Sequence, residues 1–277
     1  MKKSLMIGLM GAMTLVACNQ EKEKVEDQFN YTVEQFADLQ LLRFKVHGFE
    51  ELPLKQKELV YYLSEAALQG RDILFDQNGK YNLIIRKMLE VVYTDYQGDR
   101  SDANFKNFET YLKRVWFSNG IHHHYAADKF VPGFTPEFFK SALESVDASK
   151  LPLMEGETLD ALCNEVFPVI FDAKVMAKRV NQADGEDLVL TSASNYYEGV
   201  TQKEAEDFYA KMKNPNDTMP VMFGMNSRLV KENGKIQEKV WKSGGLYGQA
   251  IDKIIYWLEK AQGVAENDKQ KAVISKM

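Results

Sequence analysis

The residues best suited to chemistry lie in one short string, Asn119-Gly120-Ile121-His122-His123-His124-Tyr125, and His47 is the only histidine outside it. Imidazole titrates near neutral pH and is a common metal ligand. In an extended segment His122 and His124 would share a side, because side chains alternate, and Asp128 follows closely. These groups would suit a divalent metal. Zinc ligands usually lie about a helical turn apart, however, so the contiguous histidines favour a polar loop at a cleft or an interdomain surface.

The other candidate groups favour structural roles. His47 is isolated and is more typical of a packed or surface histidine than of a ligand. The string Ser243-Gly244-Gly245-Leu246-Tyr247-Gly248 opens a helix, so its N–H groups would suit an anion, but its composition favours a flexible turn. Cys163 follows Leu162 on an apolar helical face and is expected to be a buried, inert thiol.

Composition and missing motifs exclude several classes of function. The 277 residues include 35 Lys+Arg and 40 Asp+Glu, giving a net charge of −5, so no basic surface for nucleic acid is expected. Two cysteines cannot build a disulfide framework. The sequence contains no His-Glu-x-x-His, P-loop, dinucleotide-binding or Gly-x-Ser-x-Gly motif.

The N-terminus has the pattern of a bacterial lipoprotein. Lys2 and Lys3 precede a short apolar stretch, and Leu15-Val16-Ala17-Cys18 ends it. We therefore interpret residues 1–17 as a signal peptide, Cys18 as the lipidated residue, and residues 18–30 as the lipidated cysteine and a charged tether. The predicted partner is a membrane of the cell envelope, reached through the lipid on Cys18. An ordinary signal peptide with an incidental cysteine remains the alternative.

Most of the remaining chain has helical periodicity. Helices are predicted over residues 55–69, 83–93 and 248–261, after the caps Asp102, Thr135 and Thr201, and near residues 266–274, with a turn at Asp76-Gln77-Asn78-Gly79. In the helix after Asp102, the predicted apolar stripe comprises Phe105, Phe108, Leu112, Val115 and Trp116. In the helix over 248–261, the predicted buried face comprises Ala250, Ile251, Ile254, Ile255, Leu258 and Ala261.

Strand signals are fewer. Asn233-Gly234 between two alternating segments, 228–231 and 236–241, predicts a hairpin because both turn positions need φ > 0. Residues 221–225 are predicted as its neighbouring strand and residues 41–46 as a separate strand. The predicted fold class is α+β, helix-rich with a small antiparallel β-sheet.

Three groups of strings carry a resemblance to a known family. They are Leu59-Val60-Tyr61-Tyr62-Leu63-Ser64-Glu65-Ala66-Ala67 with Gly70-Arg71-Asp72-Ile73, Asn119 to Tyr125 with Asp128-Lys129-Phe130-Val131-Pro132, and Ser243 to Gly248 before Ala250-Ile251. Together they resemble the N-terminal part of bacterial dipeptidyl peptidase III, a family of zinc-dependent exopeptidases. None of the strings is a catalytic motif, and the resemblance runs over nearly the whole mature chain.

The resemblance implies a specific activity. Family members release dipeptides from the free N-terminus of short peptides and have two lobes around a wide cleft. A helical lobe holds zinc through His-Glu-x-x-x-His and a later glutamate, and a mixed lobe built around a β-barrel helps to bind the peptide. For this chain the resemblance implies the lower, non-zinc lobe, in which the small sheet would form a partial barrel.

This sequence lacks both zinc motifs, so no catalytic residue is carried over to any position. We therefore interpret residues 31–277 as an N-terminal, substrate-side lobe, truncated at its C-terminus, that is expected to be inactive alone and to bind no zinc. Zinc and short peptides would belong to the full-length enzyme, and whether this chain is itself an enzyme stays open. The alternative is a non-enzymatic surface lipoprotein that binds peptide or a partner protein.

Overall fold

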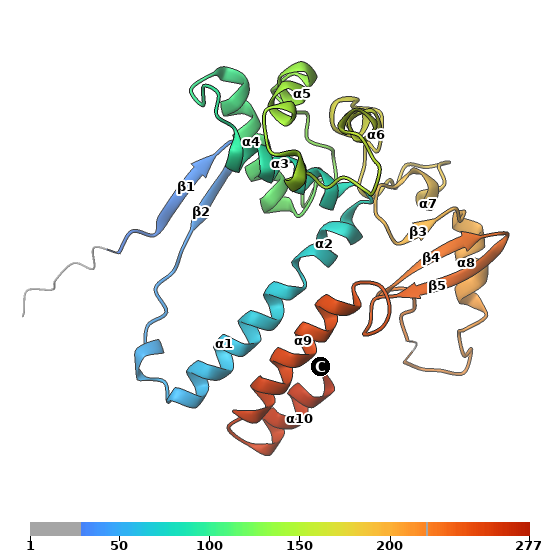
Figure 1. Ribbon diagram of the computed structural model, residues 1–277. Helices are drawn as coiled ribbons and strands as arrows, with labels where there is room; N and C mark the ends of the chain where they lie inside the picture. The colour runs from blue at the N-terminus through green and yellow to red at the C-terminus, as the bar shows by residue number, and fades with distance from the viewer. Residues whose placement is uncertain (1–28, 220) are drawn as a thin grey trace, which may run out of the picture.

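The computed structural model describes residues 29–219 and 221–277 (Figure 1). Its elements are, in chain order, β1 (Thr32–Phe36), β2 (Leu39–Leu42), η1 (Phe49–Glu51), α1 (Leu54–Gln69), α2 (Arg71–Asn78), α3 (Asn82–Asp95), α4 (Ala103–Ser118), α5 (Pro136–Glu144), η2 (Ala148–Lys150), α6 (Leu159–Phe171), α7 (Leu188–Thr191), β3 (Tyr197–Glu198), α8 (Gln202–Ala210), β4 (Ser227–Glu232), β5 (Lys235–Val240), α9 (Gly248–Gly263) and α10 (Asp268–Lys276). The predicted signal peptide, Cys18 and most of the predicted tether lie outside the described residues. The α+β class, rich in helix with small sheets, is confirmed.

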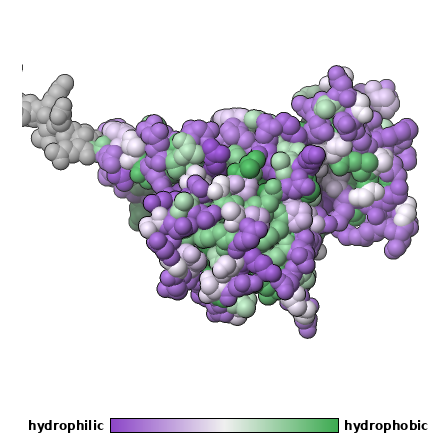
Figure 2. All heavy atoms as spheres, turned by 90° about the horizontal axis from the view of Figure 1, so that it is seen from above, coloured by the Kyte–Doolittle hydropathy of each residue, from purple (hydrophilic) through white to green (hydrophobic). Residues whose placement is uncertain are grey.

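The main core lies in the layer of α3, α4, α5 and α6, at the top of Figure 1. Helix α4 begins after the predicted cap, because the Asp102 carboxylate accepts a hydrogen bond from the Asn104 N–H at 2.8 Å. Its predicted apolar stripe is buried except at Trp116, which is 38% exposed because its indole N–H turns outward to Glu90, 2.8 Å away. Figure 2 shows apolar residues gathered on the upper face of this layer.

A second, smaller core joins α1, α9 and α10, which lie side by side in Figure 1. Leu59 of α1, Ala261 of α9 and Ile274 of α10 are its buried residues. The predicted buried face of α9 is only partly covered, and Ile255 is 41% exposed, because α9 packs against α1 and α10 without a further layer. Helix α10 confirms the helix predicted near the C-terminus, with the Asn267 side chain accepting from the Gln270 N–H.

The turn predicted at residues 76–79 is wrong over most of its length. Helix α2 continues to Asn78 and only Gly79 lies outside it. Gly70, which follows the helix predicted over residues 55–69, has φ −80°, a helical value, so α2 starts directly after α1 instead of after a left-handed turn. The consequence is that Asp76, Gln77 and Asn78 become a partly buried helical end.

The sheet beside α8 contains the predicted hairpin and one unexpected strand. Strands β4 and β5 pair antiparallel, and Asn233 and Gly234 have positive φ of 50° and 75°. The third strand is β3, parallel to β4, and residues 221–225 form no strand, so the sheet is mixed. This partner comes from a distant stretch that is only two residues long, too short to leave a periodic signal.

The N-terminal strands form a separate hairpin of β1 and β2. The strand predicted over 41–46 ends at Leu42, and Phe44 and Val46 beyond it are 73% and 65% exposed. In residues 29–219 and 221–277 the two sheets stay separate and close no barrel. Over the same ranges, no helix has both the length and the apolar character needed to cross a membrane.

Candidate functional site around helix α2

Helix α2 is the point at which distant parts of the chain meet through polar side chains. The α2 polar cluster consists of Asp76, Asn195, Glu198, Arg228 and Tyr247. The Asn195 amide donates to Asp76 Oδ1 at 3.2 Å, and Arg228 Nη1 donates to Asn195 Oδ1 at 3.2 Å. Tyr247 also hydrogen-bonds to the Asp76 carboxylate. Four elements or turns far apart in sequence therefore supply one group.

Backbone contacts fix the positions of these side chains. The Asn195 N–H donates to the Gln77 carbonyl at 3.0 Å, and the Leu229 N–H donates to the Tyr196 carbonyl at 2.8 Å. These bonds tie the segment before β3 to α2 on one side and to β4 on the other. Tyr247 sits at the start of α9 with a left-handed φ of 55°, which directs the chain from the glycine-rich turn into the helix.

The electrostatics of the cluster are set by the burial of Asp76 and by the charge of Arg228 beside it. Burial raises the pKa of Asp76, although Arg228 and the hydrogen bonds from Asn195 and Tyr247 oppose the shift. Burial, reinforced by Asp76 and Asp72, raises the pKa of Tyr247, so its phenol stays protonated and donates to Asp76. A positive charge placed beside Asp76 would lower its pKa again and be stabilised in return.

Glu198 is the solvent-facing acid of the cluster. Its carboxylate lies 3.8 Å from Arg228 Nη1 and 3.6 Å from Lys80 Nζ, and its side chain is 48% exposed. Exposed pairs at such distances are weak. Glu198 can therefore exchange a partner for a ligand at little cost, whereas Asn195, 4% exposed, is a fixed part of the site.

The histidine string lies against the other side of α2. The Asn78 amide donates to the Asn119 carbonyl at 3.1 Å, and the Ile121 N–H donates to Asn82 Oδ1 at 3.2 Å. Gly120 has φ +150°, and a Cβ there would lie 2.3 Å from Asn82 Nδ2. Only glycine fits this close approach, which places the histidines where α4 ends.

The three histidines have different environments. His122 is 2% exposed, with Nε2 2.7 Å from the Met176 carbonyl oxygen, and burial lowers its pKa to about 4. His123 Nδ1 accepts from the N–H groups of Tyr125 and Ala126, so the chain turns at His124 instead of continuing extended. His124 stacks on His123 with ring centroids 4.5 Å apart, and Tyr125 is 87% exposed.

The less favoured interpretation of the histidine string, a metal pair at His122 and His124, assumed an extended segment that the structure does not show. The alternation that would place His122 and His124 on one side is interrupted by the turn at His124. Across the described ranges, no three side chains of histidine, cysteine, aspartate or glutamate gather into a group that could hold a metal ion. The third ligand considered, Asp128, is instead paired with Lys178.

The remaining predicted residues take structural positions. The segment from Ser243 to Gly248 connects β5 to α9, as predicted, and the Leu246 N–H donates to the Val240 carbonyl at 2.9 Å. Cys163 is buried in α6, and burial raises the pKa of its thiol, which fits an inert cysteine. His47 is exposed at the surface.

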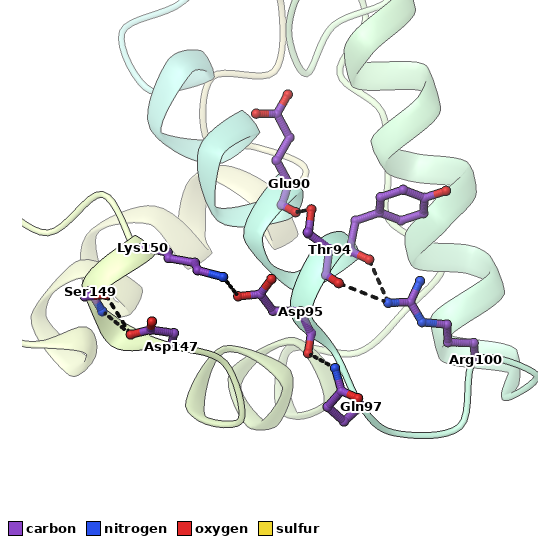
Figure 3. Close-up of polar contacts among 9 residues, drawn as sticks. Glu90, Thr94, Asp95, Gln97, Arg100, Asp147, Ser149 and Lys150 are labelled. Carbon is purple, nitrogen blue, oxygen red and sulfur yellow. Dashed lines mark hydrogen bonds and ion pairs between the residues drawn. The ribbon is translucent and has the colours of Figure 1, made fainter.

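A second polar region lies at the end of α3, beside a cavity of about 380 Å³ (Figure 3). Lys150 Nζ donates to Asp95 Oδ2 at 2.6 Å, and Arg100 Nη2 donates to the Tyr93 carbonyl at 2.9 Å. An arginine at the last carbonyls of a helix offsets the helix dipole. Lys150 and Asp95 neutralise each other and Arg100 satisfies carbonyls at the end of α3, so we assign the region a structural role.

Sequence reasoning missed most of the α2 polar cluster. The sequence predicts a turn at Asp76, and Asn195, Glu198 and Arg228 belong to no recognised motif. Tyr247 alone lies in a string that the sequence singles out. Comparison of the chain with protein-family models finds no matching family, and comparison with curated proteins finds no match.

Proposed function

We propose that this chain is the peptide-binding, non-zinc part of a dipeptidyl peptidase III-like exopeptidase, and that the α2 polar cluster binds the ammonium group of a peptide N-terminus. Zinc and the general base would be supplied by residues that this sequence does not contain, because it has no His-Glu-x-x-x-His. The chain alone would bind peptides without cleaving them.

One observation carries the proposal: the three groups of strings that resemble the family meet around α2. The first runs through α1 into α2, the second contacts Asn78 through Asn119, and the third contacts Asp76 through Tyr247. If these strings served only to stabilise the fold, we would not expect all three to meet at the end of one helix, beside a group of polar side chains.

The chemistry of the cluster supports an amine as its ligand. A primary ammonium needs acceptors with negative charge, and Asp76 and Glu198 supply two carboxylates. Asn195 is held by Asp76 and Arg228, so it keeps the Asp76 carboxylate in place without neutralising it. Binding an ammonium would stabilise the ionised form of Asp76, whose pKa burial raises in the free protein.

The test is calorimetric titration of the 277-residue chain with a short apolar peptide that has a free N-terminus and with the same peptide N-acetylated. We expect acetylation to weaken binding by about tenfold or more, because it removes the charge. Glu198→Gln should weaken binding of the free peptide similarly. Glu232→Gln is the matched control, because Glu232 is an exposed glutamate on β4 that pairs with Lys239. This variant should bind the free peptide as the wild type does.

Equal affinity for the free and acetylated peptides would refute the assignment of the cluster to the peptide amine. The absence of chemistry is tested separately with a dipeptidyl-arylamide substrate and a chelator. Turnover by the purified chain that a chelator abolishes would overturn the view that the zinc site lies on other residues.

A further inference from the structure

The hairpin β1–β2 and helix α4 enclose a pocket that the proposed function does not use. Its walls are formed by Glu34, Phe36 and Leu41 of the hairpin and by Lys113, Trp116 and Phe117 of α4, and its volume is about 300 Å³. We call it the hairpin pocket. Figure 1 shows the hairpin reaching the body of the protein beside α4.

Ion pairs hold the two walls together. Lys113 Nζ lies 2.5 Å from Glu34 Oε1 and 2.9 Å from Glu109 Oε1. Arg114 Nη2 lies 2.7 Å from Asp38 Oδ1, at the turn of the hairpin. Both charged side chains that line the pocket, Glu34 and Lys113, are therefore already paired with each other. A charged ligand would lose its hydration in the pocket and would find no unpaired charge of opposite sign there, so an uncharged ligand is favoured.

The rest of the lining is aromatic or aliphatic and faces solvent. Trp116 is 38% exposed and Phe117 is 40% exposed, unusually open positions for such large rings. The Trp116 indole N–H already donates to Glu90, so the ring presents no unsatisfied donor to a ligand. Phe117 makes a T-shaped contact with the ring of His124, with ring centroids 5.0 Å apart.

We propose that the hairpin pocket binds one uncharged aromatic ring, such as the side chain of phenylalanine. A closed apolar cavity of about 150 Å³ accommodates benzene, so a 300 Å³ pocket has room for a ring and its first linking atoms. Phe36, Trp116 and Phe117 supply ring faces and edges for offset or edge-to-face packing. The proposal is independent of the α2 polar cluster and of any peptidase activity.

The test is a titration of the full chain, labelled with ¹⁵N at tryptophan, with N-acetyl-phenylalanine amide. Trp116, Trp241 and Trp257 give three indole signals, and the Trp116→Phe variant identifies that of Trp116. We expect a saturable shift of the Trp116 signal while the other two stay in place. N-acetyl-lysine amide, which carries a charge, should leave all three signals unchanged.

A pair of variants on β2 gives a matched control. Leu41 lines the pocket, whereas its neighbour Leu42 is 51% exposed and is absent from the lining. Leu41→Asp should weaken binding by about tenfold or more, because it places an unpaired charge in the pocket, and Leu42→Asp should leave the affinity unchanged. Phe117→Ala, on the opposite wall, removes a ring from the pocket without altering the hairpin and should also weaken binding.

A further titration separates the two sources of such a ring. The ligand is an uncharged, capped pentapeptide with one central phenylalanine. If the pentapeptide binds more tightly than N-acetyl-phenylalanine amide, the natural ligand is an extended peptide segment that also pairs with the open edge of the hairpin. If the two bind equally, the pocket recognises the ring alone. The proposal is overturned if no signal saturates, if all three tryptophans shift together, or if both Leu41→Asp and Phe117→Ala bind like the wild type.

Discussion

The protein is expected to lose stability between about pH 7 and about pH 5, and replacing His122 with glutamine is expected to prevent a large part of that loss. His122 is almost fully buried and its Nε2 faces the Met176 carbonyl, which can only accept a hydrogen bond. Nε2 therefore carries a proton, and Nδ1 has no partner among the described residues. The ring is neutral at pH 7 because burial lowers its pKa. Protonating Nδ1 would place an unsolvated charge inside the protein.

The magnitude follows from the pKa of His122. Burial is the largest cause of its fall from 6.5 to about 4, the Met176 carbonyl opposes it, and the charges of Lys129 and Arg179 add to it. The folded state then binds fewer protons than the unfolded state below pH 6.5, so stability is complete above that pH and falls as the pH drops toward 4. At about pH 5 the expected loss is about 2 kcal/mol.

The assay is urea unfolding followed by circular dichroism at the two pH values, for the wild type and for His122→Gln. Glutamine can donate to the Met176 carbonyl but does not titrate, so the variant should lose about 2 kcal/mol less than the wild type. Carboxylates with lowered pKa do not confuse the comparison. Glu204, lowered to about 2 chiefly by its hydrogen bond from Lys231, contributes stability that is lost only below its ordinary value of 4.5. The same loss in both proteins would refute the reasoning.

Two further predictions concern a glycine and a lysine near the histidine string. Gly120→Ala should destabilise the protein by about 2 kcal/mol or more in urea unfolding, because its Cβ would collide with Asn82 at a positive φ. Gly263→Ala, at a position with open space, is the control. Equal stability of the two variants would contradict the prediction. Lys129→Met should cost about 2 kcal/mol in the same assay, because the ammonium donates to the carbonyl oxygens of Val169, 2.9 Å away, and Asp172 at the end of α6 and to that of Val175 beyond it. An unchanged unfolding midpoint would show that water replaces it.

The sequence predicted features that are settled within a few residues. The caps at Asp102, Thr135 and Thr201 are all formed, because each side chain accepts from an N–H two or three residues later. The hairpin at Asn233-Gly234 is also determined locally, because the two turn residues alone decide whether positive φ is tolerated. Such interactions require no knowledge of the rest of the chain.

Features that join distant segments were missed or misplaced. The expected covered face of α9 needed a neighbouring layer that periodicity cannot supply. The alternation that would place His122 and His124 on one side is broken by the turn at His124. The third strand of the sheet came from Tyr197 and not from residues 221–225, because parallel pairing depends on how the whole chain returns to β4.

For this protein the sequence by itself determined the class, the helix starts at Asp102, Thr135 and Thr201, the β4–β5 hairpin and the burial of Cys163, all of which depend on local periodicity and capping. Only the tertiary structure decided that Asp76 belongs to a polar cluster with Asn195 and Arg228, and that the β1–β2 hairpin and α4 form the two sides of a pocket. Both sites are made of side chains that are each ordinary in sequence. They gain their chemistry from burial and proximity, which arise only when the segments pack together.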